Sequence, residues 1–207
     1  MCMAFLHGFC LAFGLIIPLG VQNIFIFNQG ATQPRLSYAL PSVLTAALCD
    51  TFLILLAVFG VAFIVLQIIW LKEVIFIIGF LFLLYMGFVT WRTKVRAGDS
   101  HKYSLPASRQ ILFAASVSIL NPHAVIDSIT VIGSNSLNYA DATKWVFAFA
   151  CILVSWLWFF GLAFLGHKLH ELDHDGSWLQ RINKLSAVII WSVAAYIGWQ
   201  LLRLMYE

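Results

Sequence analysis

The sequence predicts an all-α membrane protein in which six transmembrane helices form two inverted three-helix repeats. Of its 207 residues, 62% are hydrophobic and only 10% are charged, whereas soluble domains are roughly half apolar and a quarter charged. A helix that crosses a bilayer needs about 20 apolar residues, and the chain contains several such stretches in close succession. We therefore expect a single membrane domain, embedded in the lipid bilayer.

Six apolar stretches separated by charged loops are the predicted spans. They cover residues 4–27, 38–66, 74–91, 111–133, 145–165 and 185–202. The first could be mistaken for a secretory signal, but Arg35 is the first charged side chain, so the basic segment of such a signal is missing. We expect this stretch to be retained. Aromatic side chains that settle at headgroup level lie near the span ends: Trp70, Trp91, Trp145, Trp178, Trp199 and Tyr206.

Lysines and arginines predict the orientation, because basic loops near span ends tend to stay in the cytoplasm. With six spans, only Lys72, Lys144 and Arg203 lie on one face. The opposite face carries Arg35, Arg92, Lys94, Arg96, Lys102, Arg109, Lys168, Arg181 and Lys184. Both termini are therefore predicted outside, with three basic loops in the cytoplasm. Basic residues confined to short loops also argue against a nucleic-acid partner.

The chain divides into two halves, residues 1–104 and 105–207, with three predicted spans each. An odd number of spans per half means that the second half is inverted in the membrane, as in many transporters. A weak internal match supports this division. Pro18 and Asn23 correspond to Pro122 and Asp127 at a constant offset of 104 residues.

Asp50 and Asp127 are the only charged side chains inside the predicted spans. A carboxylate at this depth costs several kcal/mol unless it is paired, hydrated or protonated. Asp50 lies among small and hydroxylated residues, which suit a packed interior or a wet cavity better than lipid. Both aspartates could simply bond to neighbouring hydroxyls or amides. We favour a role in binding substrate and protons, because intramembrane acids usually mark transport sites.

A proline predicts a helix break in the first span of each half, because it lacks a backbone donor. Pro18 and Gly20 mark the first break, and Pro122 marks the second. Breaks at corresponding positions of inverted halves point to a substrate site, since free helix ends bind charged groups. A simple proline kink is the alternative. Polar side chains nevertheless crowd both breaks: Gln22 and Asn23 in the first, and Asn121, His123 and Asp127 in the second.

Other chemistry has little support in the sequence. It contains no nucleophile and base pair, HExxH motif or phosphate loop, so neither an enzyme nor a cofactor is predicted. The four cysteines form no CxxC pair, which argues against a redox or zinc site. Residues 167–175 contain His167, His170 and His174 at helical spacings that could bind a divalent metal. We interpret this segment as a solvated loop, without a predicted metal site.

The polar motifs resemble those of the lysine exporter family of amino-acid efflux proteins, and the chain length and span count also fit it. The matching residues are Gly20-Val21-Gln22-Asn23, Asn28-Gln29-Gly30, Asp50, Leu120-Asn121-Pro122-His123 and Asp127. Asn-Pro-His followed by aspartate resembles the branch that carries basic amino acids, whereas the neutral branch typically has Asn-Pro-Lys. The sequence differs from the family pattern at Val21, where proline is usual.

This resemblance implies export of arginine, lysine or a similar amino acid across a bacterial inner membrane, coupled to protons. The residues agree, because two buried acids without a basic partner leave a negative cavity that a cationic substrate would balance. The alternative cargo is a neutral amino acid or a divalent cation. The alternative class of protein is a membrane-embedded enzyme or an assembly factor. Small residues such as Gly8 and Gly87 permit helix contacts within one chain or in a homo-oligomer.

Overall fold

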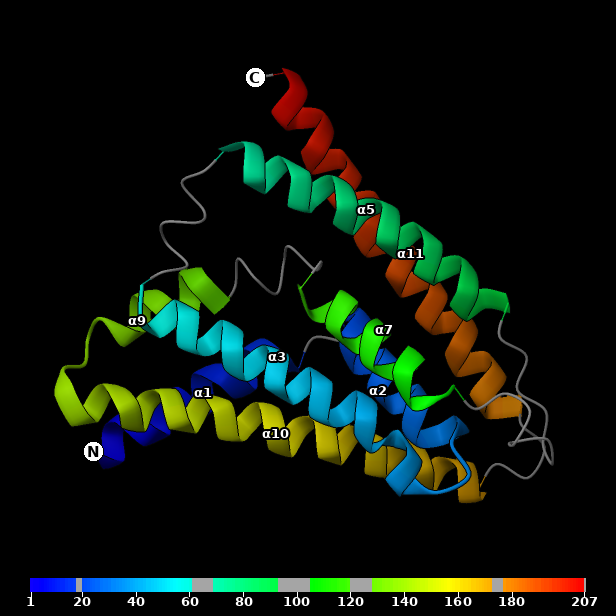
Figure 1. Cartoon of the computed structure of the whole chain (residues 1–207), viewed down its shortest axis with the longest axis horizontal. Coiled ribbons are helices and arrows are strands. Elements are labelled where there is room, and N and C mark those ends of the chain that lie inside the picture. Colours follow the sequence, from blue (N-terminus) through cyan, green and yellow to red (C-terminus); the bar gives the residue numbers. More distant parts are fainter. Residues whose placement is uncertain (18–19, 61–68, 93–104, 120–127, 173–176, 207) are drawn as a thin grey trace.

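The described part of the chain is helical. A computed structural model describes residues 1–17, 20–60, 69–92, 105–119, 128–172 and 177–206, and these ranges contain no strand. The elements are α1 (Cys2–Ile16), α2 (Val21–Thr32), the 3-10 turn η1 (Leu36–Ala39), α3 (Leu40–Val58), α5 (Ile69–Arg92), α7 (Ala107–Ile119), the π-helical turn η2 (Ser128–Gly133), α9 (Ser134–Ser136), α10 (Asp141–Leu172) and α11 (Ser177–Tyr206) (Figure 1). The prediction of an all-α chain is therefore confirmed for these residues.

Several of these helices are long and apolar enough to cross a membrane. Leu36–Val58, Asp141–Leu169 and Lys184–Arg203 qualify individually, and the bent pair of α1 and α2 adds a fourth if it forms one span. The predicted span 74–91 lies within α5, whereas the predicted span 111–133 includes residues 120–127, outside the described part. The chain is thus a multi-pass membrane protein, while the six-helix arrangement stays a prediction.

The first predicted span, 4–27, is two helices instead of one. α1 ends at Ile16, α2 begins at Val21, and their axes differ by 81°. Gly20 precedes α2 in an extended conformation, with φ −78° and ψ 170°. Pro18 lies outside the described residues. The apolar pattern correctly indicated helix on both sides, but the size of the bend depends on packing that local sequence does not encode.

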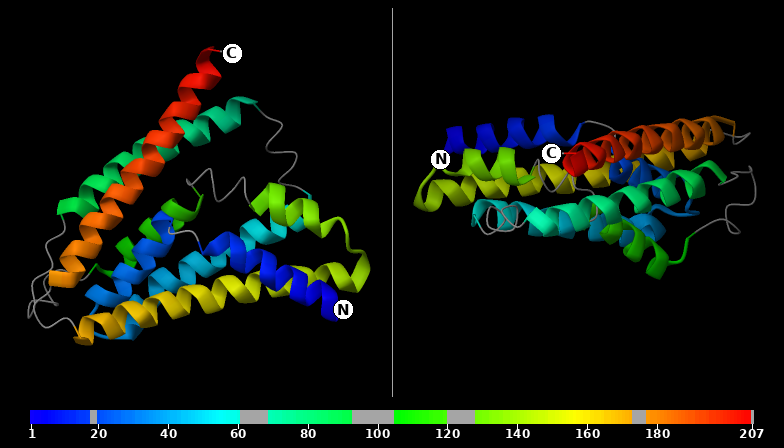
Figure 2. Two further views of the ribbon diagram at one scale, coloured as in Figure 1. Left: turned by 180° about the vertical axis from the view of Figure 1, so that it is seen from behind. Right: turned by 90° about the horizontal axis from the view of Figure 1, so that it is seen from above.

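Two helices, α10 and α3, organise the packing. α10 contacts α1 and α2 along its length, and α3 runs beside α10 while contacting α7 and η2 (Figure 1). The pair α5 and α11 packs mainly on itself and contacts the rest through α2 and α7. Seen from above, α1 and α11 lie toward one face of the molecule, and α3, α5 and α7 toward the other (Figure 2).

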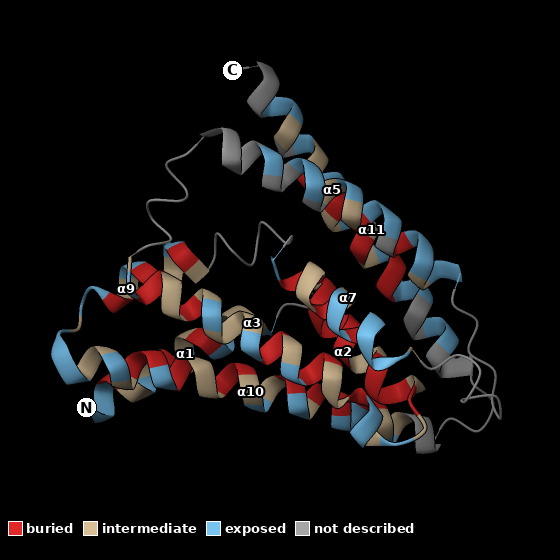
Figure 3. Cartoon of the chain, viewed as in Figure 1, coloured by how far each residue is buried: buried red, intermediate tan, exposed pale blue. Residues whose placement is uncertain are grey.

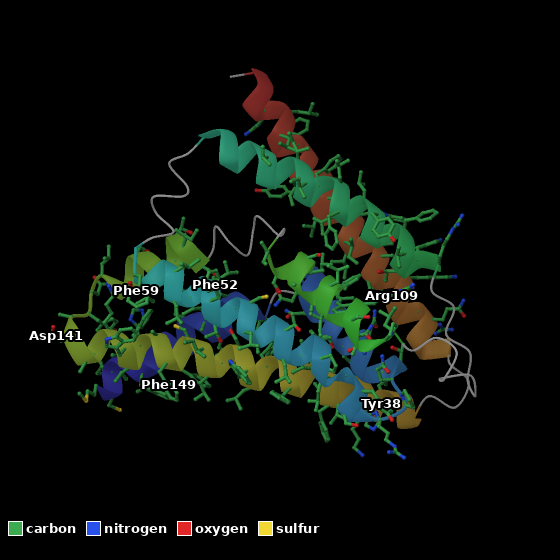
Figure 4. All side chains as sticks on the ribbon, viewed as in Figure 1. Tyr38, Phe52, Phe59, Arg109, Asp141 and Phe149 are labelled. Atoms are coloured by element: carbon green, nitrogen blue, oxygen red, sulfur yellow. The ribbon has the colours of Figure 1, made fainter. Side chains whose placement is uncertain are left out.

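The helices carry both buried and exposed positions (Figure 3). The exposed positions include many large apolar side chains, and the buried positions include several polar ones. Phe52, Phe59 and Phe149 point outward from α3 and α10 (Figure 4), and each is about 60% exposed. Such exposure is costly in water but suits contact with lipid chains. Inside, Phe159, Val43 and Ala46 are almost completely buried and share one core cluster. The polar residues of interest lie among these buried positions.

One side of the molecule collects most of the basic side chains. α3, α7 and α11 begin there, and α5 and α10 end there (Figure 1). Arg109 and Tyr38 are labelled on this side in Figure 4, with Asp141 at the opposite end. The described lysines and arginines near it are Arg35, Arg92, Arg109, Lys168, Arg181 and Lys184. The predicted grouping of basic loops agrees with this arrangement, and their membrane side stays a prediction.

The histidine-containing segment differs from the predicted loop. α10 continues to Leu172, so residues 167–172 are helical, and residues 173–176 lie outside the described part. Lys168 approaches the ring of Phe164, one turn earlier, to 5.9 Å. The loop interpretation was wrong for residues 167–172, because polar composition marks the end of an apolar span but does not end a helix.

Candidate functional site

Asp50 lies in the middle of α3, where three helices meet. From α2, Gln22 Nε2 donates a hydrogen bond to Asp50 Oδ1 at 3.1 Å. From α10, the Ser155 side chain lies beside the Asp50 carboxyl group. Gln22 is 8% exposed and Ser155 4% exposed, whereas Asp50 is half-buried. Gln22 and Ser155 are both neutral, so neither balances the charge of an ionised carboxylate.

A second polar contact between α3 and α10 lies directly beside the first. Trp156 Nε1 donates to Thr51 Oγ1 at 3.1 Å, and Thr51 Oγ1 donates in turn to the Ala47 carbonyl at 2.7 Å. Because Thr51 follows Asp50 and Trp156 follows Ser155, two consecutive residues of each helix meet. These contacts fix the two helices against each other at the level of the carboxyl group.

The break between α1 and α2 adjoins this group of residues. Asn23 Nδ2 donates to the carbonyl oxygen of Ile16, the last residue of α1, at 2.7 Å. Gln22 and Asn23 belong to the first turn of α2, whose backbone N–H groups lack intrahelical partners and carry a partial positive charge. The first turn of α2 therefore links the Asp50 carboxyl group to the carbonyl end of α1 through Gln22 and Asn23.

The second half of the predicted site falls on residues that the structure does not describe: Asn121, Pro122, His123 and Asp127. Both flanking segments are described, and both contact α3. Ser118, near the end of α7, lies close to Cys49, the neighbour of Asp50, and its hydroxyl donates to the Ala114 carbonyl at 2.9 Å. On the other side, η2 packs on α3, where Gly133 approaches Ala57. The two described segments that flank residues 120–127 therefore both pack against α3, the helix that carries Asp50.

Three members of this cluster were not predicted: Thr51, Ser155 and Trp156. Burying a single hydroxyl in an apolar span costs less free energy than burying a carboxylate, so a hydroxyl does not by itself indicate a site in the sequence. One signal was available, because Thr51 and Ser155 are separated by 104 residues, the same offset that relates Pro18 to Pro122. Among the described residues, no group of three or more histidine, cysteine, aspartate or glutamate side chains could hold a metal ion.

The chain is similar to known transport proteins over most of its length. The family model described as "LysE type translocator" matches residues 13–200. "Putative amino-acid transporter YisU" of Bacillus subtilis is 49% identical over 195 residues, which cover 94% of this chain and 89% of that protein. "Arginine exporter protein ArgO" of Salmonella typhimurium is 34% identical over 195 residues, with 92% and 90% covered. No solved structure matches the chain.

Proposed function

The chain belongs to the LysE type translocator family, and we propose that it exports a basic amino acid, arginine or lysine, by alternating access in exchange for protons. Its relatives are transporters and exporters of amino acids, so it is a transporter and not an enzyme. The observation that carries the proposal is Asp50, a carboxyl group within an apolar helix that accepts a hydrogen bond from the neutral side chain of Gln22.

The charge of the site favours a cationic substrate. A carboxyl group inside a membrane protein is stable when a positive group balances its charge or when a proton neutralises it. Gln22 orients the Asp50 carboxyl group but leaves its charge to be balanced. A guanidinium or ammonium group arriving with the substrate would supply the counter-charge. The relative that is 34% identical and named an arginine exporter favours the same class of substrate.

The helix break would bind the other end of the substrate. The first turn of α2 offers backbone N–H groups and the Gln22 and Asn23 amides, which suit an α-carboxylate. The carbonyl end of α1, now bonded by Asn23, suits an α-amino group. In the second half, we assign the same roles to Asn121, His123 and the break at Pro122, with Asp127 as the second acid. These four assignments rest on sequence, including the offset of 104 residues.

Proton exchange follows from the electrical cost of exporting a cation. Moving one positive charge outward against an inside-negative potential costs about 2.3 kcal/mol per 100 mV. One proton moving inward cancels this term. Asp50 or Asp127 would carry the proton, because protonation removes the carboxylate charge after the substrate leaves.

Alternating access by inverted repeats requires two halves with equivalent contacts, and the packing supports such a correspondence. α10 contacts both α1 and α2, as α3 contacts both α7 and η2. If residues 1–104 and 105–207 are two inverted three-helix repeats, α3 and α10 are equivalent helices, and these two sets of contacts are equivalent as well. We propose this six-helix arrangement in a bacterial inner membrane, with both termini outside and the basic loops in the cytoplasm.

Efflux of radiolabelled arginine and lysine from loaded vesicles tests this function. We expect Asp50→Asn and Asp127→Asn to lose most of the export, because neither variant can pair its site with a cation or carry a proton. Asp141→Asn, at the exposed start of α10, is the matched control and should export normally. Normal export by both site variants would refute the assigned roles. Efflux of a neutral amino acid or a divalent cation alone would refute the assigned substrate.

A further inference from the structure

We propose that one end of the α5–α11 pair binds the headgroup of an anionic phospholipid through Arg92 of α5 and Lys184 of α11. The two helices pack side by side, and α5 ends on the side of the molecule where α11 begins (Figure 1). Arg92 is the last residue of α5, Lys184 lies near the start of α11, and both side chains are exposed. The inference goes beyond the proposed function, because it does not depend on which substrate is exported.

Both cations lie over aromatic rings. The guanidinium carbon of Arg92 is 4.2 Å from the centre of the Phe88 ring, and Lys184 Nζ is 5.9 Å from the centre of the Trp91 ring. These distances are within the range of cation–π attraction. Trp191 of α11 lies against Trp91, and we call Phe88, Trp91 and Trp191 the aromatic platform. Its rings position the two cations, but they are neutral and leave both positive charges to be balanced.

The packing of the two helices fixes the aromatic platform. The ring centres of Trp91 and Trp191 are 5.6 Å apart, and Trp191 Nε1 donates to the Leu84 carbonyl oxygen at 3.4 Å. Gly87 leaves room for this indole, because a Cβ at Gly87 would overlap Trp191. Cations from two helices are therefore brought to one end of a packed pair.

The sequence of these two helices supplies no acidic residue at this end. α11 contains no aspartate or glutamate, and the one in α5 is Glu73, near the opposite end of the helix. A lipid phosphate carries the missing negative charge, and it can accept two N–H groups of a guanidinium in a bidentate contact. Basic residues at the membrane surface attract anionic lipids, and basic pockets between helices bind their headgroups.

A row of exposed apolar side chains favours a lipid over a soluble anion. Ile77, Leu81 and Phe88 are separated by four and seven residues on α5, so they share one face, which ends at Arg92. From Ile77 to Phe88 the helix extends about 16 Å, roughly half of the apolar thickness of a bilayer. This is the depth of one leaflet, so an acyl chain can follow the row while its headgroup meets the two cations.

Melting of the purified full-length chain in a neutral detergent, with added lipid, tests this site. We expect phosphatidylglycerol, which is anionic, to raise the melting temperature at lower concentrations than phosphatidylcholine does. Arg92→Gln and Lys184→Gln should each raise the half-saturating concentration of phosphatidylglycerol about fivefold, without changing the response to phosphatidylcholine. Arg203→Gln is the matched control, because the Arg203 guanidinium lies 5.9 Å from the Trp199 ring at the other end of α11. It should respond to both lipids as the original protein does.

Two further measurements separate charge from altered packing. Arg92→Lys keeps the positive charge and should keep most of the preference for phosphatidylglycerol. In the original protein, about 1 M salt should weaken this preference, because it shortens the Debye length to about 3 Å; this measurement needs no variant to fold.

Three results would overturn the proposal. An unchanged preference in the Arg92→Gln, Lys184→Gln double variant would exclude the site. An equal loss of preference in Arg203→Gln would show attraction to the overall positive charge alone. Equal stabilisation by sodium phosphate at the same concentration would exclude a lipid as the ligand. The measurements contain no arginine or lysine, so their failure is distinguishable from failure of the proposed export.

Discussion

Two clusters of buried polar side chains join the halves of this chain, and they differ in charge. The Asp50 cluster consists of Gln22, Asp50, Thr51, Ser155 and Trp156, where α2, α3 and α10 meet. The glutamine cluster consists of Gln29, Gln33 and Gln110 with the carbonyl groups of Tyr38 and Leu105, where α2 ends and α7 begins. One contains a carboxyl group, and the other contains only neutral groups.

The glutamine cluster satisfies itself largely with backbone. Gln33 Nε2 donates to the Leu105 carbonyl at 3.0 Å, and Gln110 Nε2 donates to the same oxygen and to the Tyr38 carbonyl, each at 2.9 Å. Gln33 and Gln110 are 2% and 1% exposed, so these bonds are shielded from competing water. Neutral amides bonded to carbonyl groups need nothing from outside the protein.

The difference between the clusters indicates where transport chemistry lies. Both contain buried glutamine donors, so buried amides alone do not identify a substrate site. In the Asp50 cluster the donors leave a carboxylate without a counter-charge, and this requirement can be met by a cation or a proton. We infer that the glutamine cluster stabilises the fold, whereas the Asp50 cluster binds cargo.

Gly30→Ala should produce the largest effect, because it disturbs both clusters together. Gly30 lies on α2 between Gln22 and Gln33, and a Cβ there would be 2.1 Å from the Ala163 carbonyl oxygen of α10. Separating the two helices should cost about 3 kcal/mol or more, seen as a lower melting temperature and less folded protein. Gly14→Ala, with no atom within 4 Å of its Cβ, is the control. Equal melting of the two variants would contradict this packing.

Gln22→Leu should weaken substrate binding more than it weakens the fold. It removes the α2 donor to Asp50, a bond to a charged group, so KM for arginine should rise on the order of 10-fold. Gln33→Leu replaces a buried amide on the same helix, but in the neutral cluster, and should leave KM unchanged. The comparison fails if both variants raise KM equally in the transport assay.

Gln110→Leu should show the opposite pattern, with reduced stability and an unchanged KM. It removes two bonds to carbonyl groups. It also removes Gln110 Oε1, which is buried and has no hydrogen-bond partner among the described residues. These terms partly cancel, so we expect a net loss of about 1 kcal/mol in the free energy of unfolding. A changed KM at unaltered melting temperature would place Gln110 in the transport site instead.

The two clusters also differ in how far the sequence predicts them. Asp50 stands out because a charge inside an apolar stretch is costly, and Gln22 follows a predicted helix break. Both predictions need only local sequence. Gln33 and Gln110 lie near polar segments, where glutamine is ordinary, and their bonds join residues 72 positions away in the sequence. No local pattern indicates such a contact.

The helices were predictable to a similar degree. Apolar runs of the right length identified α3, α10 and α11, because burial in lipid demands them. The 81° bend between α1 and α2 and the extension of α10 through His167 depend on tertiary packing and on helix propensity beyond the membrane. Ser155 and Trp156 were missed for a related reason. The partners of hydroxyl and indole groups within an apolar span lie on another helix, and the local sequence does not indicate them.

The smallest effect is expected from Trp156→Phe, which tests the neutral edge of the Asp50 cluster. It removes the indole donor to Thr51, a bond between neutral groups worth about 0.5–1.5 kcal/mol. Trp158→Phe is a close control on the same helix, because Trp158 Nε1 is buried without a partner in the part of the chain that the structure describes.

Both substitutions lose similar ring volume, so the difference between their melting temperatures isolates the hydrogen bond. Trp156→Phe should melt at a lower temperature than Trp158→Phe, while both retain the original KM for arginine, because neither indole bonds to the carboxyl group. A rise in KM for Trp156→Phe would extend the binding site to the Thr51 contact. A melting temperature of Trp158→Phe below that of Trp156→Phe would contradict the hydrogen bonding of α10, because removing an unpartnered buried donor relieves its desolvation cost.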